Sequence, residues 1–88
     1  MSCTVRIASP LRSYTNGAAS VAAAGGTVAE VLTDLDRRYP GMRFRMIDEQ
    51  DRIRRHVRVF VNTRETQTLA ERVSSGDEVH FICALSGG

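Results

Sequence analysis

The sequence predicts an α+β fold, in which a mixed sheet of four to five strands has one main helix packed across it. Short segments in which apolar and polar residues alternate lie near both ends of the chain and around residue 60, and such alternation is typical of half-buried strands. One segment with helical periodicity lies between them and begins at Thr27. The chain has 88 residues, 42% of them apolar and 25% charged, which is typical of one ordinary globular domain.

The first quarter of the chain is expected to form a hairpin. Residues 4–8 alternate as a strand does, and Pro10 ends that strand. Asn16-Gly17 is a turn signal, after which residues 19–23 return as a second strand. Because alanine is a poor strand former, this returning strand is the weaker of the two.

The element that begins at Thr27 is the clearest helix. Thr27 and Glu30 form a capping box, in which each side chain satisfies a free backbone N–H group at the start of the helix. Pro40-Gly41 ends the helix. The apolar stripe at helical spacing consists of Val28, Val31, Leu32, Leu35 and Tyr39. The solvent side is expected to hold Asp34, Asp36 and Arg37.

The second half of the chain contains two further strands, at residues 56–62 and 79–84. Residues 42–55 are interpreted as an ordered surface loop with at most one helical turn, anchored by Phe44, Met46 and Ile47. A short helical turn is expected at Leu69 and Val73, and residues 75–77 turn the chain into the last strand. The side chains predicted to point inward from the two strands are those of Val57, Val59, Val61, Val79, Phe81 and Cys83.

This order of strand, strand, helix, strand, strand, with the first and last strands parallel in the middle of the sheet, is that of the ubiquitin-like β-grasp. We assign residues 1–84 to the β-grasp domain and residues 85–88 to a flexible tail that ends in Gly87-Gly88. Glycine lacks a Cβ atom, so such a tail is thin enough to pass through a narrow channel. Two glycines can also end a chain by chance, so the tail has to be judged together with the fold.

No catalytic or metal-binding constellation is visible in the sequence. His56 and His80 are interpreted as sheet-surface residues, and the carboxylates of residues 48–51 as part of a solvated loop. Cys3 and Cys83 are too few for a disulfide framework, a zinc site or an iron–sulfur cluster, and we favour a buried thiol for Cys83. No apolar run approaches the roughly 18 residues that span a bilayer, and the N-terminus lacks a signal-peptide pattern. We therefore expect a cytoplasmic protein without a membrane partner.

The charge is concentrated in one segment. All twelve basic residues are arginine, and eight of them lie in residues 37–58 with three carboxylates. A basic patch can hold nucleic acid, but this segment has few aromatic residues for base stacking and no recognised nucleic-acid motif. We therefore favour a solvated or partner-facing surface over a nucleic-acid site.

Apolar side chains are also predicted on the face of the sheet that points away from the helix. Phe60 and Ile82 point there from strands that are neighbours in this fold, and Arg58 and His80 lie beside them. Exposed apolar residues on a bare sheet face usually mark a protein contact, although scattered surface hydrophobes are common. We predict that these four residues dock a partner.

Five features of the sequence occur together: Leu11-Arg12, the helix that begins at Thr27, Val57-Arg58-Val59-Phe60-Val61-Asn62, Gly76-Asp77-Glu78-Val79 and the terminal Gly87-Gly88. In this combination the chain resembles the MoaD/ThiS family of ubiquitin-like sulfur carrier proteins over essentially its whole length. The long stretch from residue 39 to residue 62 is more similar to the CysO-type carriers of cysteine biosynthesis than to the shorter ThiS proteins.

The resemblance implies a carrier protein that is not itself an enzyme and binds no cofactor or metal. A MoeB/ThiF-type activating enzyme would use ATP to adenylate the carboxylate of Gly88, and a sulfur donor would convert the adenylate to a thiocarboxylate. Gly87, Ser86 and Leu85 would form the tail that enters the partner enzymes. The partner enzyme that uses the sulfur would be a cysteine-synthase-like enzyme or the large subunit of molybdopterin synthase. The molecule that accepts the sulfur would be an activated serine, a molybdopterin precursor, a thiazole precursor or a secondary metabolite.

Two other functions stay open at this point. One is a ubiquitin-like interaction module whose tail is never activated, so that changes at Gly88 would leave its function untouched. The other is a small nucleic-acid binder that uses the arginine-rich segment and whose affinity falls steeply with salt.

Overall fold

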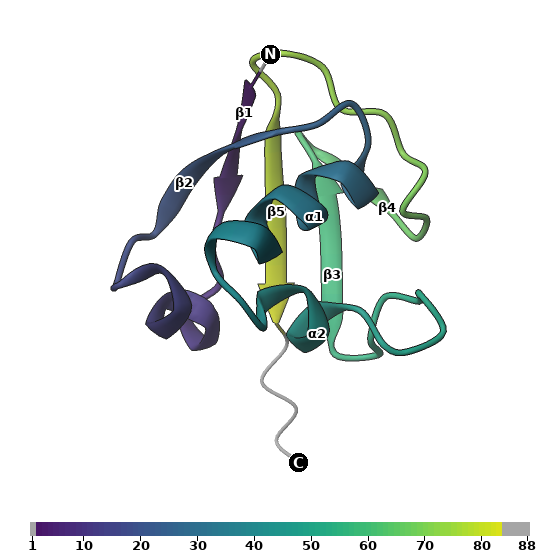
Figure 1. Ribbon diagram of the computed structural model, residues 1–88. Helices are drawn as coiled ribbons and strands as arrows, with labels where there is room; N and C mark the ends of the chain where they lie inside the picture. Colours follow the sequence, from purple (N-terminus) through teal and green to yellow (C-terminus); the bar gives the residue numbers. More distant parts are fainter. Residues whose placement is uncertain (1, 84–88) are drawn as a thin grey trace.

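The sheet is built around its first and last strands, which lie side by side in its centre. The computed structural model describes residues 2–83. In chain order the elements are β1 (Ser2–Arg6), the 3₁₀ helix η1 (Ser9–Thr15), β2 (Ser20–Ala24), α1 (Val28–Arg38), α2 (Met42–Met46), β3 (Val57–Val61), β4 (Arg64–Thr66) and β5 (Glu78–Cys83). The strands follow the order β2-β1-β5-β3-β4 across the sheet (Figure 1). β1 and β5 pair in parallel and the other neighbours are antiparallel, so the predicted β-grasp is confirmed.

The N-terminal hairpin forms as predicted, but its connection contains a helix that the sequence analysis missed. Pro10 occupies an early position of η1, where its missing N–H costs no helical hydrogen bond, so it starts a helix as well as ending a strand. η1 buries Leu11 and Thr15. It ends at Asn16, which adopts the left-handed conformation (φ 56°) at the predicted turn.

α1 packs across one face of the sheet, and its start is fixed by the predicted capping residues. The Glu30 N–H donates to Thr27 Oγ1 (3.2 Å). In return, the Glu30 carboxylate accepts a hydrogen bond from the Gly26 N–H (2.7 Å), one residue before the N–H that a standard capping box satisfies. The predicted apolar stripe is confirmed: Val28, Val31, Leu32 and Leu35 are buried, and Tyr39 is partly buried.

Gly25 precedes this cap in a conformation that favours glycine (φ 153°). A Cβ atom here would lie 2.7 Å from the Val31 nitrogen and 2.9 Å from the Glu30 carbonyl carbon, and these backbone atoms cannot rotate away. We expect Gly25→Ala to lower the free energy of unfolding by about 3 kcal/mol, as urea unfolding would measure. The control is Gly17→Ala, at a positive φ (87°) but with no described atom within 4 Å of the added Cβ, and it should cost about 1 kcal/mol. Equal losses would contradict the close approach at Gly25.

Asp34 does not face solvent as predicted, because it closes the edge of β2. Only 12% of its side chain is exposed. Its carboxylate accepts a hydrogen bond from the Ala24 N–H (3.0 Å) and pairs with Arg37 (2.5 Å) and Arg38 (2.9 Å). Arg38 also donates to the Ala22 carbonyl. Side chains of α1 thus cover backbone groups of an edge strand that could otherwise pair with another chain.

The same contacts make a pH-dependent contribution to stability. The Ala24 N–H, with Arg37 and Arg38 beside the carboxylate, holds the pKa of Asp34 below its ordinary value, against the opposing effect of burial. A carboxyl whose pKa is lower in the folded state stabilises the fold above its unfolded pKa of about 3.9, and this contribution is lost as the pH falls through the folded pKa.

We therefore expect Asp34→Asn to lower the free energy of unfolding near neutral pH. Below about pH 4 the free energies of unfolding of the variant and the wild type should become more similar. Urea unfolding at the two pH values measures this. Glu49→Gln is the matched control, since Glu49 is exposed and has no ion pair with any described residue. A deficit of the same size at both pH values would contradict the account.

The segment that follows α1 contains a short helix, and one predicted anchor in it is wrong. Phe44 is 59% exposed, whereas Met42, Met46 and Ile47 are fully buried. Met42 and Met46 lie four residues apart on one face of α2, which turns Phe44 between them toward solvent. The anchoring residues are therefore the two methionines and Ile47.

The second half of the sheet contains a strand that the sequence analysis missed. β3 buries Val57, Val59 and Val61 as predicted. The chain then turns at residues 62–63 and forms β4, whose pairing with β3 begins at Val61 opposite Arg64. The predicted helical turn at Leu69 and Val73 is reduced to one hydrogen-bonded turn at residues 69–70, where the Glu71 N–H donates to the Thr68 carbonyl (3.4 Å). Val73 is buried and Leu69 partly buried.

Within residues 2–83, no helix is both long and apolar enough to cross a membrane.

Candidate docking face and carrier tail

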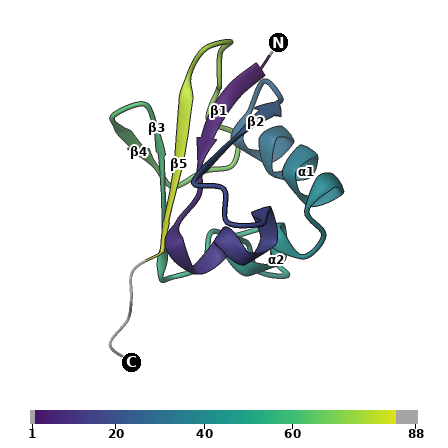
Figure 2. The same ribbon diagram turned by 90° about the vertical axis from the view of Figure 1, so that its left-hand side faces the viewer.

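The four predicted docking residues lie together on the bare face of the sheet. Figure 2 shows α1 and α2 on one side of the sheet, and the side chains that alternate with the buried residues of β3 and β5 point to the other. Phe60 lies opposite His80, and Arg58 lies opposite Ile82. These four residues are called the outward block below. Phe60 and Ile82 are therefore diagonal neighbours in the block.

The outward block combines two apolar and two polar side chains, which alternate diagonally across β3 and β5. Ile82 is 47% exposed, and Phe60 and His80 are half-buried. His80 Nε2 lies 3.1 Å from the Glu78 carboxylate, and Arg58 lies 3.4 Å from the Glu65 carboxylate. Exposed apolar side chains next to charged groups are found in protein interfaces.

A groove that the sequence analysis missed extends this face. It has a volume of about 390 Å³ and lies between η1 and the end of β5. Pro10 and Arg12 line it from η1, and Ile82 and Cys83 line it from β5. Arg12 Nε donates to the Ile7 carbonyl (3.1 Å), which ties η1 to the chain after β1. The alternation of β5 indicated Ile82, but no local pattern indicated that η1 folds beside it.

The predicted tail, which consists of Leu85, Ser86, Gly87 and Gly88, lies outside the described residues, as does Ala84 before it. β5 ends at Cys83, directly after Ile82 of the outward block. Gly88 is the sixth residue after Ile82, and an extended chain of that length reaches at most about 22 Å.

The thiols and carboxylates form no second reactive centre within residues 2–83. Burial raises the pKa of Cys3 and of Cys83, so both thiols are poor nucleophiles at neutral pH. Cys3 is buried and Cys83 only partly so, which corrects the prediction of a buried thiol at Cys83. No group of metal-ligating side chains occurs among the described residues. Asp48 instead accepts hydrogen bonds from the N–H groups of Gln50 and Arg52, which lower its pKa.

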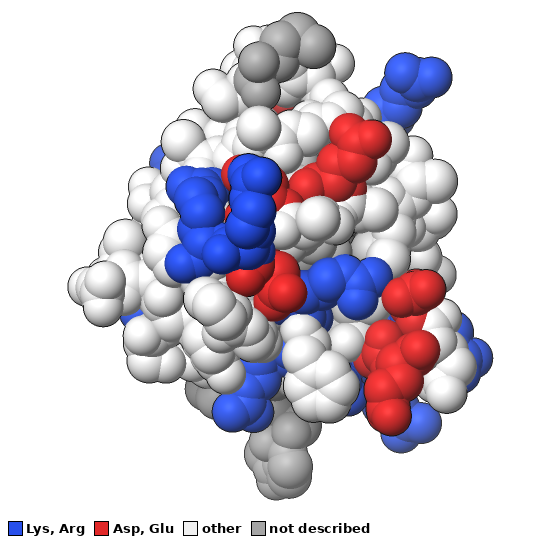
Figure 3. Space-filling model, viewed as in Figure 1, with Lys and Arg blue, Asp and Glu red and all other residues white. Residues whose placement is uncertain are grey.

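The arginines of residues 37–58 do not form one continuous basic patch. Figure 3 shows basic and acidic side chains intermingled over α1 and α2. Most of these arginines pair with carboxylates: Arg37 and Arg38 with Asp34, Arg43 with Asp51, Arg52 with Asp48, and Arg58 with Glu65. This differs from the one-sided basic stripe typical of nucleic-acid interfaces.

Comparison with known proteins gives one consistent family. The ThiS family model matches residues 5–88. The sulfur carrier protein CysO of Mycobacterium tuberculosis is 34% identical over 93 residues, which cover 100% of both chains. Its crystal structure has a TM-score of 0.88 at 33% identity and covers 94% of this chain and 99% of its own. A chain of the BexX/CysO complex from Amycolatopsis orientalis has a TM-score of 0.90 at 34% identity, covering 98% and 99%.

The fold extends to more distant proteins. SAMP1 from Haloferax volcanii has a TM-score of 0.84 at 23% identity, covers 100% of both chains, and shares the fold. The match over residues 5–88 and the relatives above 30% identity along the whole chain decide the family. The protein belongs to the ThiS family of ubiquitin-like sulfur carrier proteins.

Proposed function

We propose that this protein carries sulfur as a thiocarboxylate on Gly88 and is a co-substrate of other enzymes. The observation that carries the proposal is the family match, which runs through the final Gly87-Gly88 pair. The position of the outward block on the strand that leads into the tail supports it.

The proposed chemistry follows from the weak reactivity of a carboxylate. An oxygen of the Gly88 carboxylate attacks the α-phosphorus of ATP, and pyrophosphate leaves. The mixed anhydride formed has a good leaving group, so sulfide, as the sulfur donor, attacks its carbonyl carbon and displaces AMP. The product is a thiocarboxylate, whose sulfur is nucleophilic at neutral pH. A MoeB/ThiF-type enzyme supplies the catalytic groups, and ATP and the sulfur donor are its substrates.

In this proposal the globular domain and the tail have separate roles. The outward block docks the globular domain, and the tail presents the reacting carbon to one enzyme after another. Docking converts an encounter of two molecules into a positioned reaction, which is the main contribution that a carrier can make. The carrier binds no cofactor in this proposal.

For the sulfur acceptor we propose a substrate of a cysteine-synthase-like enzyme. The relatives reported above at more than 30% identity are CysO proteins, which supports this acceptor over a molybdopterin precursor. Incubating the thiocarboxylated protein with either synthase and its acceptor separates the two pathways. Cysteine formation supports the first pathway, and sulfur delivery only to the molybdopterin precursor would overturn it.

The activation step is tested by ATP–pyrophosphate exchange with the MoeB/ThiF-type enzyme of the same organism. Exchange that depends on this protein supports the proposal. A catalytically active cognate enzyme that gives no exchange would contradict it and favour a ubiquitin-like interaction module.

A further inference from the structure

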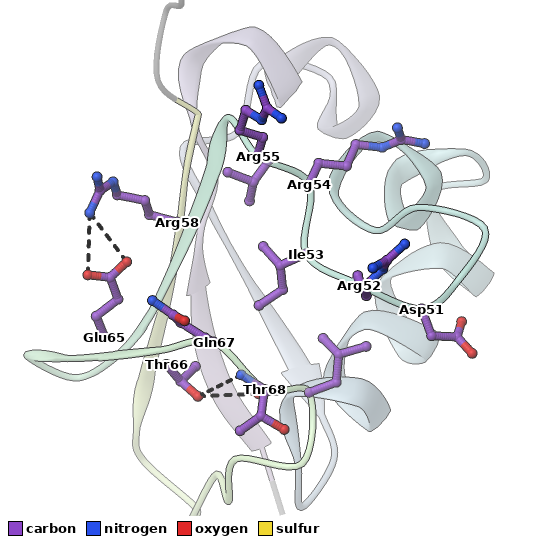
Figure 4. Close-up of a pocket in the computed structure, with 12 residues that line it drawn as sticks. Asp51, Arg52, Ile53, Arg54, Arg55, Arg58, Glu65, Thr66, Gln67 and Thr68 are labelled. Carbon is purple, nitrogen blue, oxygen red and sulfur yellow. Dashed lines mark hydrogen bonds and ion pairs between the residues drawn. The ribbon is translucent and has the colours of Figure 1, made fainter.

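A second groove lies beside β3 and is not used by the proposed function. It has a volume of about 490 Å³ and separates residues 51–58 from the chain that follows β4 (Figure 4). Ile53 points into its middle, and Val57 and Leu69 also line it. Val57 is buried, and Ile53 and Leu69 are half-buried. The groove therefore has a partly apolar floor.

The groove lies where one edge of β3 has no strand neighbour. β5 pairs with β3 from Val57 onward, whereas the pairing with β4 starts two residues later, with Val59 opposite Thr66. The Thr68 N–H donates to Thr66 Oγ1 (3.2 Å), and the chain turns out of the sheet at that point. Residues 57–58 are thus bordered by a strand on one side and by the groove on the other. The Val57 N–H is already used, because it donates to the Arg54 carbonyl (3.0 Å), so a ligand in the groove would be held by side chains and not by strand pairing.

Four arginines surround this groove, with Asp51 and Glu65 as the acidic lining residues. Two of the arginines are weakly engaged: Arg52 lies 3.9 Å from Asp48 and is 73% exposed, and Arg58 lies 3.4 Å from Glu65 and is 63% exposed. Exposed ion pairs of this kind contribute little to stability, so these side chains remain available to other anions.

The arginines are spread around the rim instead of converging on one point. Figure 4 shows Arg55, Arg54 and Arg58 projecting in different directions. Arg54 is held in place, because its guanidinium lies over the Phe44 ring (4.7 Å to the centroid) and Nε donates to the Phe44 carbonyl (2.8 Å). A single phosphate would reach few of these groups. Carboxylates repeated along an extended chain can pair with several of them at once.

We propose that this arginine groove, formed by residues 51–58 and 65–69, binds an extended acidic segment of a partner protein. Acidic side chains of the segment pair with the arginine rim, and an apolar side chain between them contacts Ile53 and Leu69. Arg58 belongs to the outward block as well as to the groove. Because the two surfaces adjoin at Arg58, one partner protein can contact the outward block and the groove at the same time.

The test is a titration of the ¹⁵N-labelled full chain, followed by amide chemical shifts. The probe is a short capped peptide in which glutamate alternates with leucine, and its matched control has glutamine in place of glutamate. We expect saturable shifts at residues 53–58 and 66–69, an affinity at least about tenfold higher than that of the glutamine peptide, and weaker binding at high salt. Because no other protein is present, the result does not depend on sulfur transfer.

Charge reversal sharpens this test. The double variant Arg52→Glu and Arg55→Glu should weaken peptide binding about tenfold or more. The control Arg37→Glu reverses a charge on α1, outside the groove, and should leave the affinity for the peptide nearly unchanged. Well-dispersed amide spectra would show that both variants are folded. The proposal is overturned if the two peptides bind equally, if the shifts do not saturate, or if inorganic pyrophosphate saturates the same amides more tightly than the peptide.

Discussion

Deletion of Gly88 is expected to abolish activation while leaving the β-grasp domain folded as before. The shortened chain still ends in a glycine carboxylate, but that carboxylate lies one residue, about 3.3–3.6 Å, short of its place. Attack on the α-phosphorus of ATP needs the reacting atoms within about 3–3.5 Å and correctly aligned. We therefore expect ATP–pyrophosphate exchange to fall by about a hundredfold or more, to the background of the enzyme alone.

The control for this deletion is Glu49→Gln, on an exposed loop far along the chain from the tail. It should retain full exchange. Urea unfolding should give the same midpoint for both variants and the wild type, because the deleted glycine lies beyond β5. Normal exchange by the Gly88-deleted protein would show that the tail is not the activated group.

Replacement of Ile82 by asparagine is expected to cause the second large loss. Ile82 is the more exposed of the two apolar residues of the outward block, and a partner that covers it must desolvate the polar substitute. An apolar anchor covered by a partner contributes about 2 kcal/mol or more, so we expect kcat/KM of the exchange reaction to fall about 30-fold or more.

Phe44→Asn provides the matched control for this substitution. Phe44 is the other large exposed apolar side chain among residues 2–83, and it lies on α2, on the covered side of the sheet. This variant should activate normally, and the urea midpoints of the two variants should show that neither has unfolded. If both variants lost activation equally, or if neither did, the outward block would not be the docking surface.

The parts of the fold that could be predicted from the sequence are those set by local patterns. The cap at Thr27 and the alternating valines of β3 depend on neighbours a few residues away, and both are confirmed. The reciprocal contact of the predicted capping box differs, because the Glu30 carboxylate accepts from the Gly26 N–H and not from that of Thr27. β4 was missed because its three residues are polar and its pairing depends on β3. In α2, five residues are too few to show which face is apolar, so Phe44 was taken for an anchor.

The same distinction applies to the candidate site. Alternation alone indicates that Phe60, His80 and Ile82 share one face, since successive strand residues point to opposite sides. It does not indicate the register that brings Arg58 opposite Ile82. Both grooves were missed because each joins segments that are distant in the sequence: η1 with β5 in one, and residues 51–58 with the chain after β4 in the other.

The most direct measurement of the central claim is the intact mass of the protein after incubation with ATP, sulfide and the MoeB/ThiF-type enzyme of the same organism. The account predicts a mass increase equal to the replacement of one oxygen atom by sulfur, located in the C-terminal fragment and absent from the Gly88-deleted protein. An unchanged mass with an enzyme shown to be active on another carrier would contradict the claim that this protein carries sulfur on Gly88.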